Sequence, residues 1–255
     1  MKLDRIIVAV DNNKDYYEFW PFVAKRWKSW GVTPTLIVVA DEPIDIDESL
    51  GDVRYIKPHP SIPTKHQAQI VRFYGAAAYE DEVCIISDID MMHLNKNYFL
   101  DSVKECGDDN IVMYSADAYP PGDFMHPAYP MSYMAAKGST FKEIIKGDLE
   151  NFHDHIEEWM GHGFGWYTDE KVFALKFQQW SDTSPNRATL LKRGFHSGPG
   201  ALSIRRIDRA EGSIYGQNLL ELNFYIDFHM PRPYGEHKEM IDRVFSQTHG
   251  EENNE

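Results

Sequence analysis

Two carboxylates separated by a single residue follow a short apolar run near the middle of the chain. The run covers residues 83–87, and the carboxylates are Asp88 and Asp90. In an extended chain, residues two apart point to the same face, so both side chains can converge on one cation where a buried strand reaches the surface. Carboxylate oxygens suit Mg²⁺ or Mn²⁺, which usually keep open positions for substrate phosphates. An isolated Asp-x-Asp is more often a solvated turn, so the surrounding elements decide its meaning.

Apolar runs and helical periodicity before this pair alternate in the order of an open α/β sheet. We predict strands at 5–10, 36–40, 53–56 and 83–87, and helices at 16–30 and 64–78. The second helix begins with a capping box at Thr64. The alternation of strands and helices predicts a mostly parallel sheet with right-handed crossovers. Asp88 and Asp90 then lie at the C-terminal edge of that sheet, where open α/β folds bind their ligands.

The second half of the chain brings further polar groups. Thr168 fits the N-cap of a helix, with Asp169 and Glu170 in the first turn, where the helix dipole favours anions. A glycine-rich aromatic turn precedes this helix. We also predict a late strand leading to His229 and a terminal helix, and we interpret residues 182–216 as loop-rich. The ranges are 161–167 for the turn, 222–226 for the strand and 236–246 for the terminal helix.

Composition sets limits on function. A chain of 255 residues with 42% hydrophobic and 26% charged residues is ordinary for a globular protein with a sizeable core. The net charge of −14 argues against nucleic acid or an anionic membrane as the main partner. The first apolar run, about six residues, is too short for a signal peptide. No run approaches the roughly 20 residues of a membrane span, so we expect a cytoplasmic protein without a transmembrane segment.

Four segments, taken in order, resemble the GT-A-fold glycosyltransferases, in particular the small kind found in viral and bacterial glycan-building pathways. The segments are 6–11, 69–74, 85–90 and 166–170. The resemblance covers about residues 4–235. It implies a GT-A fold, which is a single Rossmann-like α/β domain with a central, mostly parallel sheet flanked by helices. The resemblance also implies that one domain covers residues 1–240, with a nucleotide-binding half at about 1–115 and an acceptor-binding half at about 116–240. Residues 241–255 would then form the end of the C-terminal helix and an acidic tail.

The resemblance implies transfer of a sugar from a nucleotide diphosphate sugar, with a UDP-sugar favoured, to a hydroxyl of a glycan or other acceptor. Mn²⁺ or Mg²⁺ assists such a reaction. If the protein is viral, the reaction is expected to take place in the host cytoplasm. Asp90 is the expected metal ligand, and Asp88 is a metal ligand or a ribose contact. His229 resembles the C-terminal histidine that completes the metal site, although a histidine in a turn has the same appearance. His196 and His237 are lesser candidates for that role.

Two further sets of residues acquire roles by the resemblance. Asp169 is the expected base that takes the acceptor proton in an inverting reaction, and Glu170 is the neighbour that could replace it. Both acids could instead merely stabilise a helix start. The nucleotide contacts are expected to come from Val10, Asp11, Lys65 and Arg72. An exposed, salt-bridged arginine is the structural alternative for Arg72.

Three other functions share parts of this pattern. A phosphotransferase of the haloacid dehalogenase type also has an Asp-x-Asp after an apolar strand, but normally on an early strand. A nucleotidyltransferase usually has a glycine-rich basic loop after the first strand, and residues 11–15 contain no glycine. A binding module for carbohydrate or sugar nucleotide could keep the fold without catalysing transfer. The sequence leaves the donor sugar, the acceptor and the stereochemistry open.

Overall fold

The computed structural model describes residues 1–191, 206–207, 209 and 225–250, and for residues 249 and 250 it describes the backbone alone. Within these residues, seven strands form one sheet in the order β3-β2-β1-β4-β7-β6-β8. The strands of this sheet are β1 Arg5–Asp11, β2 Thr33–Val39, β3 Asp52–Ile56, β4 Val83–Ser87, β6 Ile111–Met113, β7 Tyr133–Lys137 and β8 Ala188–Leu190. His196 and the predicted strand residues 222–224 lie outside the described residues.

The first four strands are parallel, and β7 reverses the direction. β1 pairs in parallel with β2 and β4, and β2 pairs in parallel with β3. β7 lies antiparallel between β4 and β6, while β6 and β8 are parallel. The carboxyl ends of β1 and β4 therefore meet at one edge of the sheet, as the sequence predicted.

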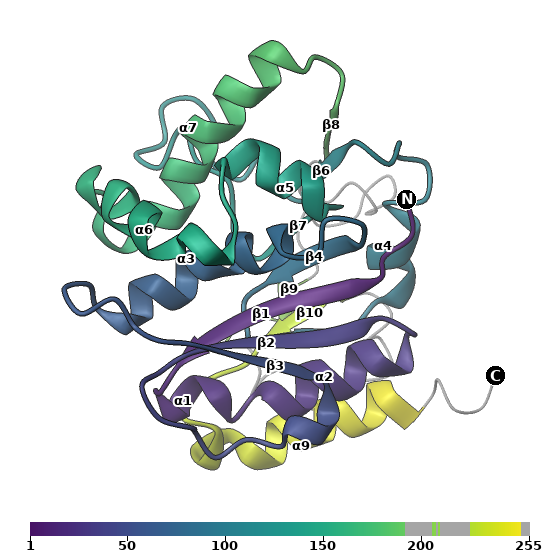
Figure 1. Cartoon of the computed structure of the whole chain (residues 1–255). Coiled ribbons are helices and arrows are strands. Elements are labelled where there is room, and N and C mark those ends of the chain that lie inside the picture. The colour runs from purple at the N-terminus through teal and green to yellow at the C-terminus, as the bar shows by residue number, and fades with distance from the viewer. Residues whose placement is uncertain (192–205, 208, 210–224, 251–255) are drawn as a thin grey trace.

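Helices cover both faces of this sheet (Figure 1). The helices are α1 Lys14–Tyr17, α2 Trp20–Ser29, α3 Thr64–Ala77, α4 Lys96–Asp101, α5 Gly138–Ile145, α6 Phe152–Gly161, α7 Thr168–Thr183 and α9 Tyr234–Gly250. Helices α3, α5, α6 and α7 lie on one side, and α2 and α9 lie on the other (Figure 1). Because successive side chains of a strand point to opposite faces, the strands supply two cores, and Val8 belongs to one while Ile7 belongs to the other.

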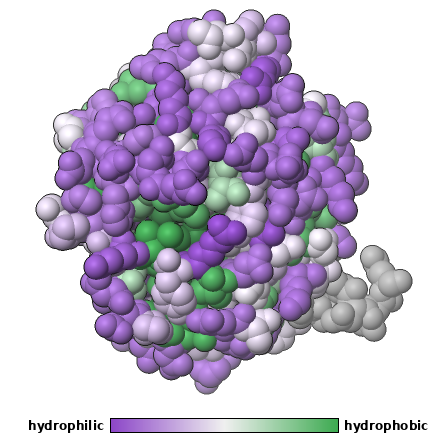
Figure 2. Space-filling model, viewed as in Figure 1, coloured by the Kyte–Doolittle hydropathy of each residue, from purple (hydrophilic) through white to green (hydrophobic). Residues whose placement is uncertain are grey.

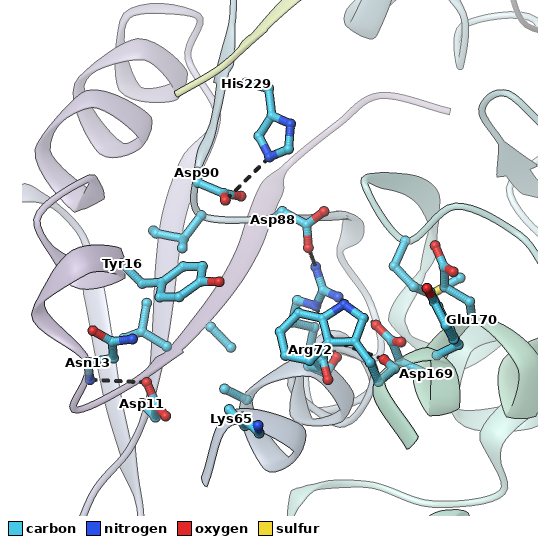
Figure 3. A pocket seen from close by; sticks show the side chains of 18 of the residues that line it. Asp11, Asn13, Tyr16, Lys65, Arg72, Asp88, Asp90, Asp169, Glu170 and His229 are labelled. Atoms are coloured by element: carbon cyan, nitrogen blue, oxygen red, sulfur yellow. Dashed lines mark hydrogen bonds and ion pairs between the residues drawn. The ribbon is translucent and has the colours of Figure 1, made fainter. Parts of the chain in front are cut away.

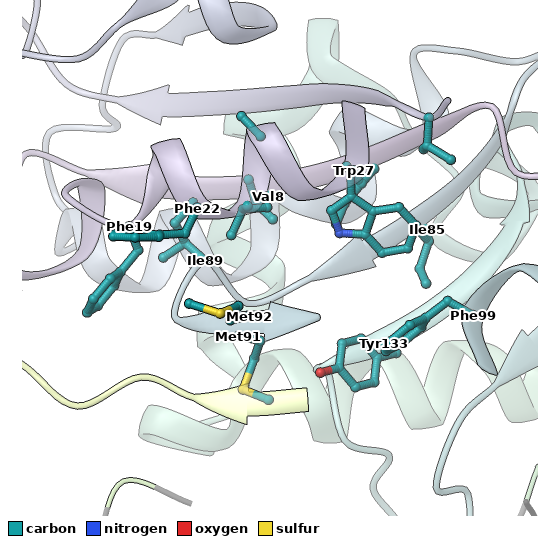
Figure 4. Packing of buried hydrophobic residues seen from close by; sticks show 14 of the residues in the cluster. Val8, Phe19, Phe22, Trp27, Ile85, Ile89, Met91, Met92, Phe99 and Tyr133 are labelled. Carbon is teal, nitrogen blue, oxygen red and sulfur yellow. The ribbon is translucent and has the colours of Figure 1, made fainter. Parts of the chain in front are cut away.

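A small second sheet carries the late part of the chain to the candidate site. It consists of β5 Met91–His93, β10 Asp227–His229 and β9 Arg206–Ile207. β10 is antiparallel to β5 and parallel to β9. The core that includes Met92 of β5 also contains Trp27 of α2 and Phe99 of α4 (Figure 4). Because β5 begins directly after Asp90, the pairing of β5 with β10 brings His229 next to the Asp-x-Asp motif.

Most predicted elements are present, although several of their ends differ and the predicted helix at 16–30 is divided into α1 and α2. The late strand predicted at 222–226 is misplaced: residues 225 and 226 are outside any strand, and β10 begins at Asp227. The Thr64 hydroxyl does not cap its helix but donates to Asp11 Oδ2 at 2.9 Å. The Thr168 hydroxyl likewise donates to the carbonyl of Gly165 at 2.8 Å, and the residue before Thr168 is the N-cap. Local sequence therefore located these helices but misassigned their caps.

The hydrophilic surface and the limited apolar character of the helices agree with the composition. The face seen in Figure 2 is mainly hydrophilic, and its hydrophobic residues gather near the middle, between the helices on the two sides of the sheet. Among the residues that the structure describes, no helix has both the length and the apolar character needed to cross a membrane. The cytoplasmic location and the division into two halves stay predictions.

Candidate functional site

A cavity of about 580 Å³ lies where the carboxyl ends of β1 and β4 face the start of α7. This volume falls within the range of roughly 300–1,000 Å³ that is typical of small-molecule sites. The main predicted site residues all line it, namely Val10, Asp11, Lys65, Arg72, Asp88, Asp90, Asp169, Glu170 and His229. The lesser candidate His237, on α9, is not a lining residue. Residues from distant parts of the sequence thus share one cavity.

The two carboxylates of the Asp-x-Asp motif have different partners (Figure 3). Asp90 is buried, and its Oδ2 pairs with Arg209, with His229 Nε2 at 3.4 Å and with Arg232 Nε at 3.8 Å. Asp88 is partly exposed and pairs through Oδ1 with Arg72. Burial favours the neutral acid at Asp90, but the bonds from His229 and Arg209 outweigh it and lower the pKa of Asp90. Asp90 is therefore held as a carboxylate.

Arg72 connects the motif to the acids at the start of α7. Its side chain is only 3% exposed, and its Nη2 donates to Asp169 Oδ2 at 3.1 Å while Nη1 contacts Asp88. Burial alone would lower the pKa of Arg72, but the carboxylates of Asp88 and Asp169 raise it above its ordinary value. Arg72 is therefore salt-bridged, as the alternative expected, but it is buried and not exposed. Arg72 is a permanent buried cation that bridges Asp88 and Asp169.

The two acids at the start of α7 titrate differently. Burial is the main reason that the pKa of Asp169 rises to about 6, although the Arg72 charge opposes the rise. Burial and the neighbouring Asp169 charge raise the pKa of Glu170 to about 8, against the hydrogen bond that it accepts from Tyr119 at 3.1 Å. At pH 7, Asp169 is mostly ionised and Glu170 mostly protonated. One acid can accept a proton while the other can donate a hydrogen bond.

The opposite side of the cavity is formed by the end of β1 and by α1. Asp11 Oδ1 accepts a hydrogen bond from the backbone of Asn13 at 3.1 Å, and Tyr16 lines the cavity nearby. Arg232 lies over the Tyr16 ring, with 4.1 Å between its Cζ and the ring centroid. Figure 3 shows Asp11, Asn13 and Tyr16 across the cavity from Glu170. This side offers an aromatic face and polar groups, which are the features that recognise a planar heterocyclic ring.

A buried polar cluster positions the strand that carries His229. The Asp227 carboxylate is fully buried and accepts from Arg206 at 2.7 and 3.0 Å and from the Tyr133 hydroxyl at 2.6 Å. These bonds tie β10 to β9 and to β7. His93 of β5 is a core residue, because Trp27 donates to its Nδ1 at 2.9 Å and burial lowers its pKa well below the ordinary value. His93 is therefore not a candidate ligand.

The donor set fits a divalent metal at Asp90 and His229. Ligands on adjacent corners of an octahedron with bonds of roughly 2.1 Å lie about 3 Å apart, close to the 3.4 Å between Asp90 Oδ2 and His229 Nε2. The part of the chain that the structure describes contains no group of three or more His, Cys, Asp or Glu side chains around one point. Mg²⁺ and its relatives commonly bind one or two protein ligands plus substrate phosphates, so two suffice.

Sequence reasoning missed several lining residues. Asn13, Tyr16, Tyr119, Arg209 and Arg232 were not predicted, although they line the cavity. The polar turn after the first strand was a signal for Asn13. Arg209 lies in a region without periodicity, so its sequence context gives no indication of a pocket. Arg232 follows His229 by three residues, and only the folded chain shows that it faces Asp90.

Comparisons with known proteins identify the fold. No protein-family model and no curated protein matches the sequence. Among solved structures, the bifunctional glycosyltransferase WbbM in its apo form aligns with 95% of this chain and 50% of its own, with a TM-score of 0.52 and 8% identity. The chain has a GT-A fold. This agreement confirms the predicted fold class, and the chain spans half the length of WbbM.

Two further solved structures match over most of this chain. The galactosyltransferase LgtC, in complex with donor and acceptor sugar analogues, aligns with 95% of both chains at 10% identity and a TM-score of 0.47. GlyE of Streptococcus pneumoniae, in its apo form, aligns with 98% of this chain and 62% of its own, at 10% identity and a TM-score of 0.48. At such identities the likeness concerns the fold, and the chemistry has to be inferred from the cavity itself.

Proposed function

We propose that the chain is a glycosyltransferase that moves a sugar from a nucleotide diphosphate sugar, with a UDP-sugar favoured, to a hydroxyl of a glycan or other acceptor. One observation carries the proposal: a single cavity in a GT-A fold has cations and the Asp-x-Asp carboxylates on one side and, on the other, two acids whose pKa values are raised. The first kind of group suits a diphosphate and the second suits a hydroxyl that must lose a proton.

Cations in the cavity supply the expected diphosphate contacts. Lys65, Arg209 and Arg232 line it, in a chain whose net charge is −14. These cations lie among five carboxyl groups that line the same cavity, so they can contact a small anion such as a diphosphate but do not form a basic surface for an extended polyanion. Guanidinium groups bind phosphate oxygens through paired hydrogen bonds. We assign Tyr16 and the end of β1, with Val10 and Asp11, to the nucleoside, because they form the aromatic and polar side of the cavity.

Asp90 and His229 would hold Mn²⁺ or Mg²⁺, with Asp88 near them. When bound, the ion would neutralise charge on the leaving diphosphate. The chain's own residues prepare this position: Asp90 is kept ionised by its neighbours, and the Asp227 cluster fixes the strand of His229. Asp88 remains a candidate ribose contact, because it is partly exposed and only its Oδ1 is in the Arg72 pair.

Asp169 would act as the base in an inverting transfer. Its pKa of about 6 leaves it ionised near neutral pH and raises its basicity above that of an ordinary aspartate. Arg72 holds its Oδ2, so the second carboxylate oxygen is the one assigned to the acceptor proton. Glu170, protonated at pH 7, would donate a hydrogen bond to the acceptor rather than remove its proton.

The first experiment separates an enzyme from a binding module that has the same fold. A panel of sugar nucleotides is incubated with the protein and Mn²⁺, and release of nucleoside diphosphate is measured. We expect slow release from one donor, lost with EDTA and in Asp90→Ala, but kept in Asp81→Ala, a matched change at an exposed aspartate. Thermal stabilisation by a sugar nucleotide without any release or transfer would favour the binding module instead.

A second experiment tests the base. Asp169→Asn should reduce transfer by about 10²–10⁴-fold, the usual effect of a general base. Binding of the nucleoside diphosphate should change little, since Asp169 is on the other side of the cavity from Tyr16 (Figure 3). Full transfer activity in Asp169→Asn would remove this residue from the role.

A further inference from the structure

Three exposed aromatic side chains gather beside the acid end of the cavity. Trp166 is 49% exposed, Tyr167 is 41% exposed and Phe124 is 74% exposed. Trp166 and Tyr167 line the cavity, and the Phe124 ring contacts the Tyr167 ring edge-on, with centroids 5.9 Å apart. Isolated exposed aromatics need no explanation, but a group of them at the edge of a polar cavity commonly marks a binding surface. We call Phe124, Trp166 and Tyr167 the aromatic platform.

Polar contacts hold the platform in place from two helices. Lys171 of α7 donates to the carbonyl of Phe124 at 2.9 Å, and the side chain of Gln69 of α3 donates to the carbonyl of Trp166 at 3.5 Å. The indole of Trp166 also lies beside the Lys65 amine, with 5.9 Å between the amine nitrogen and the ring centroid. The rings are therefore displayed on a fixed backbone, which lowers the entropy cost of binding a ligand.

The backbone of the turn before α7 is built to present these rings. Gly163 and Gly165 have φ values of +74° and +58°, a region that disfavours side chains. The short 3₁₀ helix Gly165–Tyr167 then leads directly into α7. Since Asp169 is two residues after Tyr167, the turn that displays the platform also positions the proposed base.

An aromatic face beside polar acids matches one class of acceptor. A pyranose ring has an apolar face of C–H groups and an edge of hydroxyls, so it can lie on an indole or phenol ring while its hydroxyls reach polar groups. A serine or threonine hydroxyl of a peptide has no such face. A lipid alcohol would require a longer apolar channel, whereas the platform is flanked by Lys65 and Glu170.

We propose that the aromatic platform is the acceptor subsite and that the acceptor is a glycan, whose terminal pyranose ring stacks on Trp166 and Tyr167 with a hydroxyl directed to Asp169. This inference rests on the proposed function and narrows its acceptor from any hydroxyl compound to a carbohydrate. Phe124 supports the Tyr167 ring, and its own ring enlarges the surface so that the next sugar of the acceptor glycan can also bind.

The test measures donor turnover with three classes of acceptor. The wild-type protein, Mn²⁺ and the donor found by the hydrolysis screen are mixed with methyl pyranosides and oligosaccharides, with serine and threonine peptides, or with octanol. Stimulation of nucleoside diphosphate release by saccharides supports the inference. Stimulation only by peptides or octanol, or by none of the three while the donor is still hydrolysed, overturns it. Absence of both donor binding and hydrolysis would instead refute the proposed function.

Variants then locate the subsite. Trp166→Ala should raise the KM for the saccharide by roughly 5- to 20-fold, as expected for loss of one stacked ring, with a smaller change in kcat. Trp166→Phe should recover most of the affinity, which distinguishes stacking from misfolding. Tyr55→Ala, at an exposed tyrosine of β3 that does not line the cavity, should leave the KM unchanged. An unaltered KM in Trp166→Ala would exclude the platform as the acceptor subsite.

Discussion

Glu170→Gln should make the folded protein more stable above neutral pH, because the native structure penalises the ionised form of this glutamate. Its pKa rises from an ordinary 4.5 to about 8, through burial first and the Asp169 charge second. The folded state therefore binds more protons than the unfolded state between these values, and this group's contribution to stability falls as the pH rises from 4.5 to 8. Each pKa unit corresponds to about 1.4 kcal/mol, so the loss between pH 5 and 8 is on the order of 3 kcal/mol.

Glutamine has nearly the same shape as a protonated glutamic acid, and it does not titrate. Glu170→Gln should therefore unfold at a temperature roughly 6–12 °C above the wild type at pH 8, and much closer to it at pH 5, given the usual 2–4 °C per kcal/mol for a chain of this size. The assay is thermal unfolding at pH 5, 6, 7 and 8. Glu239→Gln, at an exposed glutamate of α9, makes the same change in charge and should stay within about 0.5 kcal/mol of the wild type.

Two results would refute this reasoning. If Glu170→Gln and the wild type lose stability in parallel from pH 5 to 8, Glu170 does not have a raised pKa. If Glu170→Gln loses transfer activity at pH 7 as severely as Asp169→Asn, the ionised carboxylate of Glu170 is needed, and the proposed roles of the two acids are reversed.

Three more outcomes follow from the charges around the cavity. Transfer by the wild type should fall as the pH drops through about 6, because protonation of Asp169 removes the base, and Asp169→Asn should lack this step in its residual rate. Arg209→Ala should bind Mn²⁺ about fivefold more tightly by calorimetry, because its guanidinium no longer competes for Asp90. Asp227→Ala should lose about 3–5 kcal/mol of unfolding free energy in urea, because Arg206 would keep a largely buried charge without its carboxylate.

Matched changes on α9 serve as controls for the last two outcomes. Arg243→Ala removes an exposed arginine and should leave the Mn²⁺ affinity unchanged. Asp242→Ala removes a carboxylate that pairs with Lys238 at the surface, and such pairs contribute about 0–1 kcal/mol. Weaker Mn²⁺ binding in Arg209→Ala, or equal losses in the two aspartate variants, would contradict the described contacts.

The sequence by itself determined the order of the elements and the edge at which chemistry occurs. Continuous apolar runs such as Ile6–Val10 and the helical stripe of α3 report burial and periodicity, which are local properties. A polar residue directly after a buried parallel strand must lie at its carboxyl edge, so Asp11, Asp88 and Asp90 could be placed there without coordinates. The GT-A resemblance extended this placement to Asp169 and His229.

Only the tertiary structure decided which of these groups touch. Arg72 and Asp169 are 97 positions apart, and their ion pair depends on how α3 packs against α7. Phe124, in the loop between β6 and β7, contacts Tyr167 only because that loop packs against the turn before α7. The pKa values of Asp169 and Glu170 depend on burial, which no local pattern near a helix start reveals. Sequence periodicity records which face of an element is buried, whereas pair contacts and desolvation arise only when distant elements come together.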